Sequence, residues 1–157
     1  MKHQKGFTLP EIIIITGIIL MLFGFITLNV INTQYQTSIS TTVDTLIADI
    51  KSQQIKAMAG NKETGSSPES YGIHFESNKY TLFHGSTYSP GDSSNFTINL
   101  SFNIQFRSNS RSEIIFEKGS GEIYQFSNST NQIILQDTTG NTKTISINLY
   151  GTVVGIN

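Results

Sequence analysis

Glu11 is the residue of this sequence whose type and position most clearly suggest chemistry. It stands at the start of residues 12–31, an apolar run that contains no Asp, Glu, Lys, Arg or His. A carboxylate beside such a run is costly to bury alone, so it is usually retained for a partner or a function. We therefore expect Glu11 to meet a positive charge on another copy of a similar protein. A plainer interpretation is that an acid in the first helical turn stabilises the helix by about 0.3–1 kcal/mol through the macrodipole.

Side chains for other chemistry are scarce. His3 lies close to the start of the sequence, and His74 and His84 are expected on opposite faces of one predicted hairpin, so no shared metal site is predicted. The sequence contains no HExxH, GxSxG, phosphate-binding loop or carboxylate cluster. It also contains no cysteine, which excludes thiol chemistry and disulfides. We therefore predict a protein that is not an enzyme, with no catalytic residues, no cofactor and no metal ion.

Length and charge limit the possible classes further. A chain of 157 residues allows one ordinary domain with an attached helix. Its formal net charge is −1, and Arg107 and Arg111 are its only arginines. A protein that binds the phosphate backbone of nucleic acid would show a clustered basic surface. The composition therefore argues against DNA as a partner.

The apolar run predicts a membrane anchor. A bilayer is spanned by about 20 apolar residues in one helix, and residues 12–31 offer that length. Lys2, His3 and Lys5 precede the run, and basic residues tend to stay on the cytoplasmic side. We therefore expect a single-pass cytoplasmic (inner) membrane protein with its C-terminal domain outside the cytoplasm. A cleaved secretory signal is disfavoured, because its apolar core has only about 7–15 residues.

The next segment, residues 32–60, predicts an amphipathic helix. Its apolar residues recur close to helical spacing, with polar side chains between them. They are Ile39, Val43, Leu46, Ile47, Ile50, Ala57 and Met58. Gly60 followed by Asn61 is a C-terminal stop signal. We expect one face of this helix to pack on a β-rich domain.

After a polar loop at residues 61–70, the period of the apolar residues changes from helical to alternating. The stretches on either side of Ser77-Asn78 predict a hairpin in which Glu76 pairs with Lys79. In this register Tyr71, Ile73 and Phe75 face Tyr80, Leu82 and His84.

Residues 96–106 have the strongest alternation in the chain. One strand of this length would span roughly 36 Å, which is longer than usual, so a bend or bulge near Asn103 is expected. The other predicted strands are residues 71–76, 79–84, 114–116, 123–126, 133–135 and 145–149, and residues 151–156 continue the last one or add another.

Residues 5–11, KGFTLPE, closely resemble the processing site of type IV pilins and type II secretion pseudopilins. In that family a short basic leader ends in Gly, the next residue is usually Phe, and a Glu stands fifth in the mature chain. The resemblance implies that a prepilin peptidase cuts between Gly6 and Phe7 and that the new Phe7 amine is N-methylated. It also implies that Glu11 meets the Phe7 amine of a neighbouring subunit during filament assembly. The other residues of the processing motif are Lys5, Thr8 and Leu9. Pro10 replaces an aliphatic residue common at its position, but proline is tolerated in a first helical turn.

The remainder of the chain is similar to one branch of the family, the GspH/FimT-type minor pseudopilins. That branch has an aromatic-Gly-apolar strand, a Phe-x-x-Gly strand end, a Gly-containing hairpin and a closing strand with Gly. The matching segments are Tyr71-Gly72-Ile73, Phe116-Glu117-Lys118-Gly119, Thr139-Gly140-Asn141 and Tyr150-Gly151-Thr152-Val153. Some members bind DNA through basic residues after a similar Gly, and this chain has none after Lys143.

Together these patterns predict an α+β fold: a long N-terminal (transmembrane plus amphipathic) α-helix packed on a C-terminal antiparallel β-sheet domain, as in pilins. The predicted division is a leader at residues 1–6, a transmembrane helix segment at 7–31, an amphipathic continuation at 32–60 and a β-rich domain at 61–157. The resemblance implies a structural subunit, a minor pilin or pseudopilin, of a type IV pilus or type II secretion filament. The implied partners are a prepilin peptidase, other pilin or pseudopilin subunits, an inner-membrane assembly platform and membrane lipid. The alternatives are a major pilin and a membrane-anchored, ligand-binding β domain that does not assemble.

Overall fold

The computed structural model describes residues 8–60 and 69–157, without the side chains of residues 24–37. The helices and strands are α1 (Leu9–Met58), β1 (Tyr71–Glu76), β2 (Lys79–His84), β3 (Phe96–Asn99), β4 (Ile104–Phe106), β5 (Glu113–Phe116), the 3-10 helix η1 (Asn128–Thr130), β6 (Gln132–Asp137), β7 (Thr142–Ile147) and β8 (Val153–Ile156). The chain divides into two compact units, Met1–Gln36 and Thr37–Asn157, and α1 contributes residues to both.

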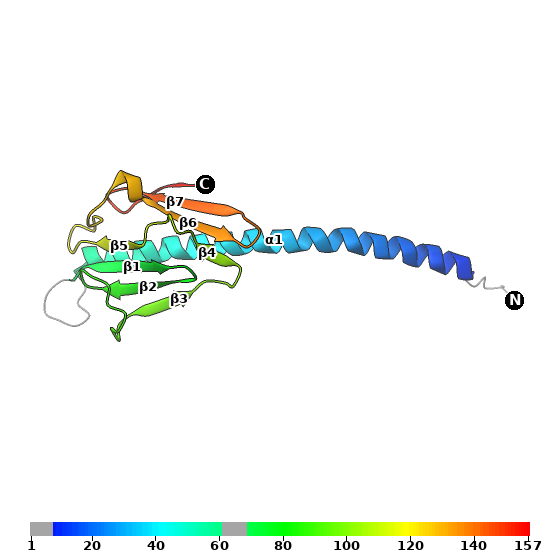
Figure 1. Ribbon diagram of the computed structural model, residues 1–157, viewed down its shortest axis with the longest axis horizontal. Helices are drawn as coiled ribbons and strands as arrows, with labels where there is room; N and C mark the ends of the chain where they lie inside the picture. Colours follow the sequence, from blue (N-terminus) through cyan, green and yellow to red (C-terminus); the bar gives the residue numbers. More distant parts are fainter. Residues whose placement is uncertain (1–7, 61–68) are drawn as a thin grey trace. The chain divides into compact units, whose positions relative to one another are not determined.

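The second unit contains two antiparallel sheets of four strands each (Figure 1). The strand order is β3-β2-β1-β5 in the first sheet and β4-β6-β7-β8 in the second. Neighbours in the chain, β3 and β4, therefore belong to different sheets. With one helix packed against these strands, the architecture of this unit is α+β.

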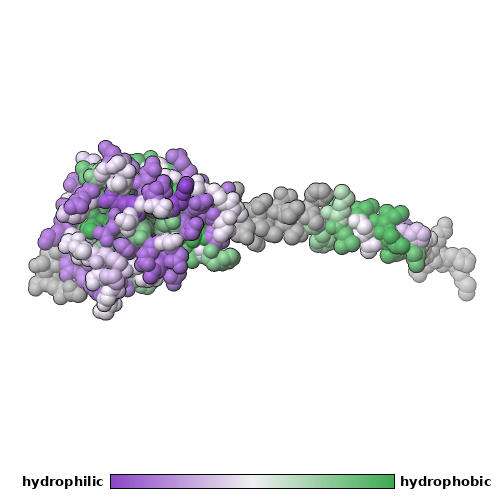
Figure 2. All heavy atoms as spheres, in the orientation of Figure 1, coloured by the Kyte–Doolittle hydropathy of each residue, from purple (hydrophilic) through white to green (hydrophobic). Residues whose placement is uncertain are grey.

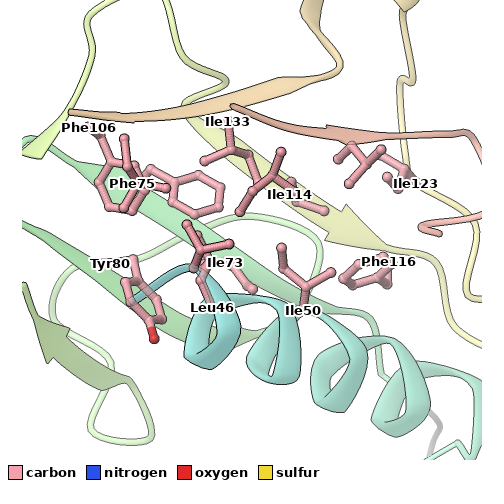
Figure 3. Packing of buried hydrophobic residues seen from close by; sticks show 14 of the residues in the cluster. Leu46, Ile50, Ile73, Phe75, Tyr80, Phe106, Ile114, Phe116, Ile123 and Ile133 are labelled. Atoms are coloured by element: carbon pink, nitrogen blue, oxygen red, sulfur yellow. The ribbon is translucent and has the colours of Figure 1, made fainter. Parts of the chain in front are cut away.

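The core of the second unit forms where one face of α1 meets the strands. Ile39, Val43, Leu46 and Ile50 recur three or four residues apart, so they share one side of the helix, and all four are buried. Figure 3 shows Leu46 and Ile50 pointing from the helix toward buried strand residues. Those residues include Ile73, Ile114, Phe116 and Ile133. The helix therefore presents the packing face that its sequence spacing predicts, except that Met58, at its end, is 53% exposed.

The hairpin predicted around Ser77-Asn78 is confirmed. In the pairing of β1 with β2, Ile73 lies opposite Leu82 and Glu76 lies opposite Lys79. Lys79 Nζ lies 3.2 Å from Glu76 Oε1 beside the turn. The alternating pattern and the two-residue turn were sufficient to set this register.

The single strand predicted at residues 96–106 is wrong. Its first part forms β3, which pairs with β2, and its last part forms β4, which pairs with β6 of the other sheet. Between them the chain turns, with the Ile104 N–H bonded to the Ser101 carbonyl at 2.9 Å. The bend expected near Asn103 is thus a crossing from one sheet to the other, where Asn103 is buried.

The strand predicted at residues 123–126 is also wrong. Only Ile123 forms a β-bridge, with Phe116. The backbone around it turns through left-handed conformations, with φ of 69° at Gly121 and 47° at Gln125. Such angles are incompatible with an extended strand.

The predicted overall architecture must be corrected in two respects. Within the part of the chain that the structure describes, no helix has a stretch long and apolar enough to cross a membrane. The transmembrane segment predicted over residues 7–31 is therefore wrong, as is the localisation as a single-pass membrane protein, because spanning needs about 20 consecutive apolar residues. The β-rich domain holds two sheets, because residues 100–103 carry the chain from one to the other.

Candidate functional site

The sequence-predicted site lies at the N-terminal end of α1, in the first unit. Lys5, Gly6 and Phe7 lie outside the described residues, so the predicted cleavage and N-methylation site has no structural account here. Thr8, the residue before the helix, and the helix residues Leu9 and Glu11 are described, and all three are exposed.

Glu11 has a local role in starting the helix. Its Oε2 accepts a hydrogen bond from the Thr8 N–H at 3.4 Å, and its own N–H donates to the Thr8 carbonyl at 3.1 Å. The carboxylate thus satisfies an amide that has no partner within the helix and lies at the positive end of its dipole. This matches the plainer interpretation of an acid in the first turn. Because the side chain is also exposed, its second oxygen is accessible to a further cation.

The first part of α1, on both sides of Glu11 and mostly after it, presents apolar side chains on all its sides. We call the large exposed apolar residues of this segment the N-terminal apolar surface. They are Leu9, Ile12, Ile13, Ile14, Ile15, Ile18, Ile19, Leu20, Met21, Leu22 and Phe23. Successive residues in a helix are about 100° apart, so a run of consecutive apolar residues covers the whole circumference. Figure 2 shows the hydrophobic colour that dominates this segment.

Thr16 does not interrupt this apolar character. Its hydroxyl donates back to the Ile12 carbonyl at 2.6 Å, so the one side-chain hydroxyl between Ile12 and Phe23 has a partner within its own helix. Gly17 has no side chain and so adds no polar group, and a Cβ built there would meet nothing within 4 Å. The surface is therefore both apolar and sterically open in the single chain.

A second candidate site surrounds His84 at the end of β2. His84 Nδ1 lies 2.8 Å from Glu69 Oε2, and His84 Nε2 lies 2.6 Å from Ser94 Oγ. A serine, a histidine and a carboxylate in this order have the arrangement used for acyl transfer. A pocket of about 130 Å³ lies beside Ser94 and His84.

The contacts of Asp92 are inconsistent with acyl-transfer chemistry at Ser94. Its Oδ1 lies 2.5 Å from Ser94 Oγ and also accepts the Ser94 N–H at 2.9 Å. The hydrogen bonds from the Ser94 hydroxyl and backbone amide lower the pKa of the Asp92 carboxyl, so it is ionised and holds the hydroxyl proton. The Ser94 hydroxyl donates its proton to Asp92 rather than toward His84 Nε2, and His84 Nε2 itself lies 3.4 Å from Asp92 Oδ2. The geometry supports a structural role, in which His84 joins Glu69 to the loop at residues 85–95.

The other histidine of the hairpin has separate contacts. His74 Nδ1 lies 3.4 Å from Glu113 Oε2, and its ring stacks on Tyr88 with 4.1 Å between centroids. Across the described ranges 8–60 and 69–157, no group of three or more His, Asp or Glu side chains could hold a metal ion.

Sequence reasoning missed two groupings that the structure creates. Glu69 and Asp92 come from segments on either side of the first hairpin, and no motif connects them with His84. Arg107 and Arg111 entered the sequence argument only as a count, yet both line one cleft. The sequence did hold a signal for this cleft: the two arginines are separated only by Ser-Asn-Ser and directly follow a strand, and such a loop concentrates hydrogen-bond donors.

Comparison of this chain with protein-family models, curated proteins and solved structures finds no match. The function proposed for it therefore rests on its own residues and their geometry.

Proposed function

We propose that this chain is a structural subunit, of the minor pilin or pseudopilin kind, of a type IV pilus or type II secretion filament. A prepilin peptidase cuts it between Gly6 and Phe7, and the N-terminal segment of α1 then joins the corresponding segments of other subunits. The observation that carries the proposal is the N-terminal apolar surface, which begins at Leu9 of a pilin-like processing motif and continues after Glu11.

An apolar surface of this extent favours a protein partner. Leu20 and Phe23 keep 72% and 64% of their area exposed, and their neighbours are exposed to a similar degree. Burial of each such side chain contributes about 1.5–3 kcal/mol. A helix that is apolar all round is normally buried on every side. Packing among several copies of the same helix supplies that burial, because each copy offers the same surface to its neighbours.

The charge pattern favours a second copy as the partner of Glu11. After Lys5 the next basic residue in the sequence is Lys51, so a chain cut after Gly6 has only its own terminal amine as a cation near Glu11. An amine from a neighbouring subunit therefore compensates the carboxylate as the surrounding helices exclude water, since an unpaired buried charge is strongly destabilising.

Processing is tested by intact-mass and N-terminal peptide analysis of the protein from its native cells, beside a Gly6→Ala variant. The expected mature chain begins at N-methylated Phe7, and the variant remains uncut. Wild-type protein that still begins at Met1 in cells with an active prepilin peptidase would contradict the proposal.

Assembly is tested by chemical cross-linking in the same cells. The chain has no cysteine, so Leu20→Cys introduces a unique reactive site on the N-terminal apolar surface for a bismaleimide. We expect a cross-linked dimer whose yield falls about tenfold with Glu11→Gln, because the variant lacks the compensating charge. Asp44→Asn removes a carboxylate from an exposed position of α1 and is the matched control that should keep the dimer yield.

Two results would reject assembly. If the processed Leu20→Cys chain remains monomeric after cross-linking, the protein is cleaved but does not polymerise. An equal loss of cross-linking with Glu11→Gln and Asp44→Asn would remove the specific role of Glu11.

Subunit abundance in sheared filaments distinguishes a minor from a major subunit. A minor subunit is expected at a small fraction of the total, and a dominant share indicates a major pilin.

A further inference from the structure

Both arginines of the chain line one cleft in the second unit, which we call the Arg107 cleft. Its volume is about 470 Å³, and its walls come from the end of β1, from β4 and β6, and from the loop at residues 107–112. This volume lies in the range of about 300–1,000 Å³ that is typical of small-ligand sites. The cleft has no part in the proposed function of the N-terminal segment.

The loop that carries the arginines is held by backbone bonds to β6. The Arg107 N–H donates to the Ile134 carbonyl at 2.9 Å, and the Arg111 N–H donates to the Gln132 carbonyl at 2.9 Å. Between them Ser110 Oγ accepts the Ile134 N–H at 3.0 Å. These bonds fix the loop at three points, so the cleft is preorganised and a ligand need not order it.

Arg111 supplies charge to the cleft wall but has few free donors. Its guanidinium donates to the carbonyls of Glu113 at 2.6 Å, Thr130 at 3.0 Å and Tyr124 at 3.5 Å. Burial lowers the pKa of Arg111, and the nearby charge of Glu113 offsets part of that effect. The guanidinium nevertheless stays protonated, as arginine does in proteins. An anion in the cleft would therefore be stabilised by a charge that water solvates poorly.

Arg107 is the charged group with free donors. It is exposed, and within the described residues its guanidinium makes no hydrogen bond or ion pair. Glu76 also lines the cleft, but Lys79 compensates its carboxylate at 3.2 Å. The cleft therefore offers one fully available guanidinium, which can bind a planar carboxylate through two parallel hydrogen bonds.

Neutral polar side chains surround this cation. Gln105 of β4 lies opposite Gln136 of β6, and Ser108 and Ser112 belong to the loop. The side chains of these four residues make no hydrogen bond within the part of the chain that the structure describes. Amides and hydroxyls can each donate and accept, which suits a ligand with several hydroxyl groups.

Two aromatic rings complete the cleft. Phe75 and Phe106 both line it, and their rings meet edge to face with 5.1 Å between centroids (Figure 3). Each residue is 7% exposed, so the rings present a small apolar area beside the polar groups. An apolar area of this kind suits the C–H groups of a sugar ring.

We propose that the Arg107 cleft binds a small sugar acid of the hexuronate class, with its carboxylate on Arg107 and its hydroxyls on the neighbouring glutamine and serine side chains. One available cation matches a ligand with a single negative charge. A phosphate monoester carries a charge of about −1.5 to −2 and would call for more than one free cation. The mixture of amides, hydroxyls and an apolar area matches a polyhydroxylated ring.

Ligand-observed saturation-transfer NMR on the full chain tests this proposal, because it tolerates both weak binding and large assemblies. The observed probes are D-galacturonate and D-galactose at equal concentration and ionic strength, and inorganic phosphate, which has no carbon-bound proton to observe, is added as a competitor. We expect saturable transfer to galacturonate and at least about tenfold weaker binding of galactose, which lacks the carboxylate.

Variants assign the site. Arg107→Gln should weaken galacturonate binding about tenfold or more, and Arg107→Lys should weaken it less, because lysine keeps the charge but loses the planar pair of donors. Lys118→Gln is the matched control: it removes one exposed positive charge outside the cleft and should leave binding within about twofold. Thermal unfolding of each variant confirms that the fold is retained.

Three outcomes would overturn the proposal. Absence of saturable transfer to galacturonate would reject the site. Equal binding losses with Arg107→Gln and Lys118→Gln would show a non-specific charge effect. Competition in which inorganic phosphate displaces galacturonate at lower concentration would replace the sugar-acid site with a phosphate site.

Discussion

The phenolic hydroxyl of Tyr80 donates a hydrogen bond of 2.6 Å to Asp49 Oδ2, which joins β2 to α1 within the second unit. Tyr80 is 1% exposed, and Figure 3 shows it beside the helix with its oxygen at the edge of the core. This side-chain hydrogen bond therefore lies at the edge of the hydrophobic core. Its removal should therefore change stability without changing core packing.

The Tyr80–Asp49 bond predicts the response of stability to alkaline pH. Burial raises the pKa of the Tyr80 phenol. The hydrogen bond to Asp49 and the negative charge of the Asp49 carboxylate raise this pKa further. The folded state therefore keeps the phenolic proton where the unfolded state, with a pKa of about 10, has lost it. Stability should be fully present below about pH 10 and should fall as the pH rises above it.

Urea unfolding across this pH range, with Tyr80→Phe and Tyr150→Phe, checks the prediction. Tyr80→Phe should lower the free energy of unfolding by about 1 kcal/mol at neutral pH and make the alkaline loss shallower. Tyr150 is 62% exposed, so its substitution should change neither the neutral value nor the slope appreciably. Parallel pH curves for all three proteins would contradict this account.

Gly72 is expected to tolerate no side chain. A Cβ at this position would lie 2.4 Å from Phe83 Cζ and 2.8 Å from the Ile114 carbonyl oxygen. The Gly72 carbonyl also accepts a hydrogen bond of 2.9 Å from the buried amide of Gln53, which restricts movement of the strand. Gly72→Ala should therefore destabilise the fold by about 1–3 kcal/mol, measured by chemical denaturation.

Gly155 provides the comparison for Gly72. It lies in β8, where a Cβ would meet nothing within 4 Å. Gly155→Ala should change stability by no more than about 0.5 kcal/mol. Similar losses for the two variants would mean that close approach at Gly72 does not limit packing.

The buried face of α1 predicts opposite outcomes for two apolar residues of the same helix. Leu46 is 0% exposed in the core, whereas Ile55 is 63% exposed. Leu46→Ala should cost about 2–5 kcal/mol, because it leaves a cavity between helix and strands. Ile55→Ala should cost less than about 0.5 kcal/mol. Thermal unfolding of the two variants measures the difference, and comparable melting temperatures would disprove the assigned packing face.

Asp137 predicts a loss of stability in acid. Burial alone would raise the pKa of its carboxyl, but hydrogen bonds from the side chains and backbone amides of Thr139 and Asn141 outweigh burial and lower it. The unfolded state therefore takes up a proton first as the pH falls. Stability should be fully present above about pH 4 and decline below it as Asp137 becomes protonated in the fold.

Asp137→Asn tests the acid response. The variant should lose about 1 kcal/mol at neutral pH, because the new amide group cannot accept the Asn141 side-chain donor. Its stability should also decline less steeply below pH 4. Asp44→Asn, at an exposed position of α1, should leave both features unchanged. An unaltered acid slope in Asp137→Asn would exclude this carboxyl as the source.

Local sequence patterns determined much of the second unit. Helical spacing alone identified the buried side of α1, because residues three or four apart must share one face. Alternation together with the turn at Ser77-Asn78 set the register of β1 and β2, because a shift by one residue would turn the apolar side chains away from the core. In the first unit, the position of Glu11 in the first helical turn indicated its local role at the helix start as the plainer interpretation, beside the expected charge partner on another copy.

Only the tertiary structure decided where residues far apart in the sequence meet. The alternation of residues 96–106 is the same whether they form one strand or two, and the crossing near Asn103 became visible only with both sheets in place. Loop paths decide which side chains meet, and periodicity carries no information about them. They bring His84 to Glu69 and Asp92. They also place Arg107 and Arg111 on one cleft. Periodicity records which side of an element is buried, whereas contacts between elements depend on how the whole chain closes around its core.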